Sequence, residues 1–82
     1  MTPAQCRAAR ALLGITQSQL ARAAKLGLST VVDFEKERRL VSEEAVKAMQ
    51  TALQRAGIVF VEDNGGGEGV RFRKPQRRAR SK

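Results

Sequence analysis

The sequence predicts a small, mainly α-helical domain of four short helices, followed by a C-terminal β-hairpin and a disordered basic tail. Three observations support this fold class. Helix-starting residues recur within residues 1–57, each followed by apolar residues at helical spacing. A β-branched run then precedes a glycine-rich stretch, and the end of the chain is dense in arginine and lysine. The 82 residues suffice for one domain with a single small core.

The composition limits both the core and the chemistry. Apolar residues make up 41% of the chain but only three residues are aromatic, so the core must be mostly aliphatic, which suits short packed helices. The single cysteine, Cys6, excludes an intramolecular disulfide and is expected to be a small core residue. Because histidine is also lacking, the common zinc sites are excluded and no cofactor is expected. No run has the length of a signal peptide or a membrane span, and a reduced, cytoplasmic setting is expected.

The formal net charge of +8 favours a nucleic-acid partner, but the charge is unevenly distributed along the chain. Residues 71–82 hold seven basic residues and no acidic one. Residues 1–70 hold nine basic and eight acidic residues, a net charge of only +1. A basic tail can be a solubilising end as well as a nucleic-acid contact, so the argument for such a partner rests on residues 1–70.

The first two helices are predicted from the residues that begin and end them. Thr2 is an N-cap hydroxyl ahead of Pro3, whose missing N–H costs nothing at the first helical position. Gly14 can end this helix. Thr16 can cap a second helix, which breaks around residues 25–27.

A third, short helix includes Val31, Phe34 and Glu35, and a fourth begins after Ser42. The Ser42 hydroxyl can cap the fourth helix, whose first turn has two glutamates that suit the positive end of the helix dipole. Gly57 closes this helix. Its apolar stripe consists of Val46, Met49, Leu53 and Ala56.

Two short strands around a glycine-rich connection predict the β-hairpin. Ile58–Val61 is β-branched and aromatic, residues 64–69 can only form a turn or loop, and Val70–Arg73 alternates apolar and basic residues. A lone hairpin is marginal in water, so it must pack on the helices or pair with another chain. The chain thus divides into a helical domain (1–57), a hairpin extension (58–74) and a tail (75–82).

Three helices in the first 37 residues, the second and third joined by a tight turn, form the frame of a helix-turn-helix. In this motif the third helix enters the major groove, while the second lies across the backbone and offers its N-terminal amides to a phosphate. Thr16 and Gln17 fit the latter role, because the amides there are free and Gln17 can reach a phosphate oxygen. The alternative is that Gln17 is only a polar residue at a helix start.

The run from Gly14 to Ala24, followed by Ser29-Thr30-Val31 and Phe34-Glu35, resembles the Xre family of phage-repressor-type regulators. The resemblance covers residues 3–56 without a gap. It implies a DNA-binding domain, a homodimer and a roughly two-fold operator in double-stranded DNA. It further implies that Gln17 contacts phosphate and that Arg10 and Glu35 form a structural ion pair, although both could be ordinary surface charges.

The sequence departs from the family pattern in the turn and on the third helix. Family members usually have glycine where Lys25 stands, and a left-handed conformation would cost lysine roughly 1 kcal/mol. Gly27 lies two residues further on, so a reshaped turn with a later helix start stays open. The positions that would face DNA on or beside the third helix are Leu28, Ser29, Val32, Asp33, Lys36 and Arg38.

Only a few of these side chains are suited to contact bases. Leu28 and Val32 can contact thymine methyl groups, and Asp33 can accept a hydrogen bond from a cytosine amine. Asp33 also repels phosphate, and a solvated surface charge is its alternative role.

The function favoured is a dimeric DNA-binding transcription regulator, most simply a repressor. The alternative is a protein-interaction module, such as an antitoxin or anti-activator, which the weak charge of residues 1–70 and the apolar Leu28 and Val32 favour. An enzyme has little support, because no acid–base pair stands in a recognisable setting. No membrane and no small-molecule effector are expected.

The dimer surface would be either the hairpin or the fourth helix with the loop before it (Leu40, Val41 and Met49). The hairpin is favoured because its first strand is apolar on both sides.

Overall fold

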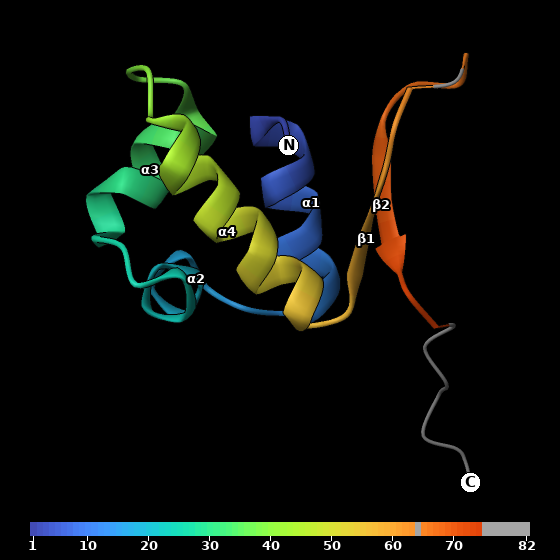
Figure 1. Cartoon of the computed structure of the whole chain (residues 1–82), viewed down its shortest axis with the longest axis horizontal. Helices are drawn as coiled ribbons and strands as arrows, with labels where there is room; N and C mark the ends of the chain where they lie inside the picture. Colours follow the sequence, from blue (N-terminus) through green and yellow to red (C-terminus); the bar gives the residue numbers. More distant parts are fainter. Residues whose placement is uncertain (64, 75–82) are drawn as a thin grey trace, which may run out of the picture.

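The computed structural model describes residues 1–63 and 65–74 of the chain. Within them the elements are α1 (Pro3–Leu13), α2 (Gln17–Ala24), α3 (Leu28–Lys36), α4 (Glu43–Arg55), β1 (Ile58–Val61) and β2 (Gly69–Phe72). The helices pack together, and the antiparallel hairpin stands beside them at the side of the molecule away from α3 (Figure 1). The predicted fold class, four helices followed by a β-hairpin, is confirmed. The predicted basic tail, 75–82, lies outside the described residues.

The predicted cap residues begin three of the helices. The hydroxyls of Thr2 and Thr16 accept the backbone N–H of Gln5 and Gln19 at 3.1 and 3.0 Å. Each glutamine side chain in turn accepts the backbone N–H of its cap residue, so α1 and α2 both start with a complete capping box. Ser42 caps α4 by accepting the N–H of the third residue after it.

The helices α1, α2 and α3 end in the same way, with one residue in the left-handed conformation. Gly14, Lys25 and Glu37 have φ values of 69°, 60° and 56°, and in each case this residue and the next donate to carbonyls of the last helical turn. Lys25 therefore adopts the left-handed conformation despite its side chain. Gly27 is extended, with φ −71°, and serves as the N-cap of α3, which begins at Leu28.

We expect Lys25→Gly to raise the free energy of unfolding by about 0.5–1 kcal/mol, because glycine has no Cβ to disfavour this conformation. Thermal unfolding followed by circular dichroism measures the change. Lys25→Ala is the matched control, since it removes the same charge but keeps a Cβ. An equal gain in both variants would assign the effect to the lost charge and contradict the backbone explanation.

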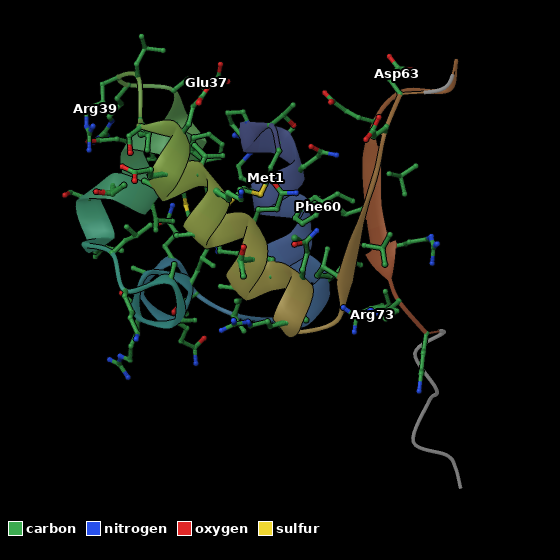
Figure 2. The ribbon with its side chains drawn as sticks, viewed as in Figure 1. Met1, Glu37, Arg39, Phe60, Asp63 and Arg73 are labelled. Atoms are coloured by element: carbon green, nitrogen blue, oxygen red, sulfur yellow. The ribbon has the colours of Figure 1, made fainter. Side chains whose placement is uncertain are left out.

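A single core joins the helices to the hairpin. Ile58 is only 1% exposed and belongs to the same buried cluster as Leu20, Met49 and Leu53 of the helices. In the hairpin, Ile58 pairs with Phe72 and Phe60 pairs with Val70, and all four side chains pack on this core. Figure 2 shows Phe60 directed from β1 toward α1. The hairpin's inner face therefore completes the core of the helical part.

Gln5 fastens the hairpin to α1. Its side chain is largely buried, with the whole residue 7% exposed. The amide nitrogen Nε2 donates to the carbonyl oxygens of Gly69 at 3.0 Å and Val61 at 3.4 Å, while Oε1 is held in the capping box. One residue thus links the start of α1 to the far end of the hairpin.

No helix in the described part of the chain is long and apolar enough to cross a membrane.

Candidate nucleic-acid interface

The helices α2 and α3 are joined by the three-residue turn 25–27, and both pack against the rest of the helical layer (Figure 1). Val31 and Glu35, which are 0% and 2% exposed, form the buried side of α3. The predicted DNA-facing residues of α3 lie on the remaining side at helical spacing. This stripe consists of Leu28, Ser29, Val32, Asp33 and Lys36.

The stripe is only partly open to solvent. Leu28 is 47% exposed, and Ser29 and Lys36 are also exposed, whereas Val32 and Asp33 are half-buried. The two ends of the stripe are thus the most accessible to a groove. An exposed leucine at the start of a helix can meet a thymine methyl group or an apolar protein surface.

Asp33 is paired with Arg39, which follows α3. The Arg39 Nε atom donates to Asp33 Oδ2 at 2.8 Å. The guanidinium therefore balances the carboxylate that would otherwise repel phosphate. Arg39 was not among the predicted site residues, because this contact needs the left-handed turn at Glu37 to bring the chain back toward α3. Figure 2 shows Glu37 and Arg39 in this region, where Lys36 and Arg38 are also exposed.

The start of α2 presents free backbone donors. The backbone N–H groups of Gln17 and Ser18 find no acceptor within residues 1–63 and 65–74, because the capping box uses only those of Thr16 and Gln19. Free amides at a helix start are suited to a phosphate oxygen. Ser18, whose side chain is exposed, was not among the predicted site residues.

The Gln17 side chain makes a hydrogen bond within the protein. Its Nε2 atom donates to Glu35 Oε1 at 2.9 Å. One N–H of the same amide group is left for another acceptor. A phosphate contact by Gln17 would therefore be made by a side chain already oriented by Glu35.

Glu35 is the centre of a buried polar network that connects α1, α2 and α3. Arg10 binds both carboxylate oxygens, with Nε to Oε2 and Nη2 to Oε1 each at 2.7 Å. The Cys6 thiol donates to Oε2 at 3.1 Å, and Arg7 donates to the backbone carbonyl of Glu35. Together with Gln17, these contacts fix α3 relative to α2, the helix whose first backbone amides are free.

The network shifts the pKa values of its members. Burial raises the pKa of the Glu35 carboxyl, but the hydrogen bonds from Arg10, Gln17 and Cys6 outweigh burial, and the pKa lies below its usual value. The hydrogen bond to Glu35 raises the pKa of Arg10. Burial and the hydrogen bond to Glu35 raise the pKa of Cys6 far above its usual value, so the thiol stays protonated and acts as a donor.

No cluster of acidic and cysteine side chains in the described part of the chain could hold a metal ion.

The fold and the site together define a DNA-binding protein of the helix-turn-helix class. A family model described as helix-turn-helix matches residues 7–56, more than half of the chain. The protein belongs to this family, whose domain is that of Xre and phage-repressor-type regulators, and the predicted resemblance is confirmed. The family consists of DNA-binding regulators rather than enzymes. No individual curated protein matches the chain.

Proposed function

We propose that the protein is a cytoplasmic, homodimeric transcriptional repressor that binds a roughly two-fold operator through α3. The observation that supports this most directly is the partly exposed stripe of α3 beside the free amides of α2, with both helices held in place by Glu35. A half-site is too short for tight and selective binding, which argues for two copies on one operator. A bound dimer would block polymerase, and protein concentration would set its occupancy.

Within this proposal the contacts divide into two kinds. The amides of Gln17 and Ser18, with the exposed Lys36 and Arg38, would bind phosphates and position the domain. The set that reads base edges would consist of Leu28, Ser29, Val32 and Asp33. Because two of these four side chains are apolar, thymine methyl groups are the expected partners of part of each half-site.

The second candidate function is protein binding by the same face. The exposed, apolar Leu28 and the pairing of Asp33 with Arg39 favour it, because both reduce the polar readout available to α3. Salt separates the two functions. Phosphate contacts release counterions, so DNA affinity falls steeply as salt rises, whereas an apolar protein contact responds little.

The test is selection of bound sites from a random DNA pool, repeated with two variants. Asp33→Ala should change the preferred bases. Arg38→Ala should weaken binding to all sequences alike and reduce the slope of log affinity against log salt by about 0.9, the value for one phosphate contact. Arg55→Ala, which removes an equal charge from the C-terminal end of α4, is the control and should change neither property. Failure to enrich any sequence would contradict the proposal and favour the protein-binding function.

A further inference from the structure

A groove opens where α1 and α4 end, beside the end of β2 (Figure 1). Its volume is about 430 Å³. Four of the side chains that line it are apolar and two are basic: Leu12, Leu13, Ala56, Phe72, Arg73 and Lys74. We call this site the basic groove. None of these residues belongs to the candidate DNA-binding face on α2 and α3.

The apolar side of the basic groove is continuous with the core. Leu13 and Phe72 are half-buried and pack against the buried cluster. Leu12 precedes Leu13 in the last turn of α1 and is 41% exposed. The three residues therefore form an apolar patch beside charged side chains, an arrangement typical of a binding site.

Hydrogen bonds hold Arg73 at the rim of the groove. Its Nη2 atom donates to the carbonyl oxygen of Gln54 at 2.6 Å, and its backbone N–H donates to that of Gly57 at 2.7 Å. A guanidinium has five N–H donors, so Arg73 can bind a carboxylate while it keeps its bond to Gln54. Lys74 adds a second exposed positive charge. Among the described residues that line the groove, none is acidic.

Charge is separated along the molecule. All eight acidic residues of the chain lie within residues 33–44 and 62–68, away from the ends of α1 and α4. Figure 2 shows two of them, Glu37 and Asp63, at the opposite end of the molecule from Arg73. The C-termini of two helices place partial negative charges, roughly half an elementary charge each, near the groove. The full charges of Arg73, Lys74 and Arg55, the last residue of α4, outweigh them.

We propose that the basic groove binds an acidic, amphipathic segment of a partner protein. Apolar side chains of the segment pack on Leu12, Leu13 and Phe72, and its carboxylates bind Arg73 and Lys74. The charge of the groove selects an acidic partner, while the apolar patch supplies the contact area that is removed from water.

Other classes of ligand use this site less well. A DNA duplex would meet it with phosphate and sugar and leave the apolar patch without a partner. A small molecule would stay largely open to solvent, because Leu12, Ala56 and both basic residues are exposed, whereas small-ligand sites bury most of the ligand.

The basic groove and the candidate DNA-binding face can be occupied together. Figure 1 shows α3 on the side of the helices away from β2. A partner in the groove therefore leaves α3 free. The inference goes beyond the proposed function and does not depend on it, since the contact forms without DNA.

The test selects short peptides from a displayed random library against the full chain, without DNA. Selected peptides should combine aspartate or glutamate with large apolar residues, and fluorescence anisotropy of a synthetic copy measures the affinity. Leu12→Gln and Lys74→Glu should each weaken its binding about tenfold. Leu40→Gln and Lys47→Glu make the same changes at exposed positions outside the groove and should bind like the natural protein. Far-UV circular dichroism verifies that all variants are folded.

Selection of no peptide, or of peptides without acidic residues, would overturn the inference. Undiminished binding by Leu12→Gln and Lys74→Glu would overturn it too, because the peptide would then lie elsewhere. A loss confined to the binding of a random-sequence DNA duplex would assign the groove to nucleic acid, and a loss confined to self-association in sedimentation equilibrium would assign it to a second copy. Site selection with Leu12→Gln should return the DNA sequence that the natural protein prefers, so a failure of the proposed function is seen separately.

Discussion

Replacing Arg10 by methionine should lower the free energy of unfolding by about 3–5 kcal/mol, the usual cost of removing one partner of a buried ion pair. The Glu35 side chain is 1% exposed and receives both of its charged hydrogen bonds from Arg10. The remaining donors, Gln17 and Cys6, are neutral and cannot balance the charge. A domain of this size is typically stable by about 4–12 kcal/mol, so the loss is a large fraction of the total. Urea titration followed by circular dichroism measures it.

The matched control adds Glu35→Leu to the same chain. Replacing both members of a buried pair by apolar residues of similar volume is often close to neutral, so the double variant should recover most of the lost stability. A double variant as unstable as Arg10→Met would show that the loss comes from the packing of the arginine stem. The cost would then have nothing to do with an unpaired carboxylate.

A fall in pH should change the stability of the natural protein and that of the Arg10→Met variant in opposite directions. In the natural protein the pKa of Glu35 is lowered on folding, so its contribution is present above its unfolded pKa of about 4.3 and is lost as the pH falls through the folded value. Glu35→Gln should remove that part of the acid sensitivity. In Arg10→Met the unpaired carboxylate can be neutralised by a proton, so the difference from the natural protein should shrink at low pH. A difference that is constant with pH would argue against the charge explanation.

The elements that local chemistry determines could be predicted from the sequence. Thr2, Thr16 and Ser42 start the helices where expected, because the capping hydrogen bond is made within three residues of the cap. The ending of α2 could not be decided, since the cost of a left-handed Lys25 has to be weighed against packing that the sequence does not display. In the structure α2 ends at Ala24 and Lys25 adopts the left-handed conformation, with φ 60°.

Contacts between residues distant in sequence could not be predicted from pattern alone. Gln5 bonds Val61 and Gly69, which are 56 and 64 residues away, and nothing near Gln5 signals this. At the candidate site, helical spacing was enough to identify the outward stripe of α3. The pairing of Asp33 with Arg39 and the bond from Gln17 to Glu35 emerged only once the turns and helix packing were known.

The hairpin illustrates the same limit, because the sequence allows it to be either an extension or part of the core. Ile58 lies with the helical residues in one buried cluster, and Phe60, Val70 and Phe72 cover that cluster from outside. Truncating a single fully buried isoleucine to alanine typically costs about 2–5 kcal/mol. Removing the whole hairpin deletes Ile58 and its three neighbours and also leaves the Gln5 amide without its carbonyl partners.

A chain that ends after Gly57 should therefore be largely unfolded at 25 °C, because the summed loss is comparable with the about 4–12 kcal/mol expected for the intact domain. Far-UV circular dichroism should show most of the helical signal lost, with no cooperative thermal transition. A chain that ends after Lys74 is the control: it keeps both strands and the Gln5 contacts and should melt like the full chain. If the chain that ends after Gly57 instead melted cooperatively near the temperature of the full chain, residues 1–57 would form a self-sufficient domain. The hairpin would then serve only as an attached surface for a second copy.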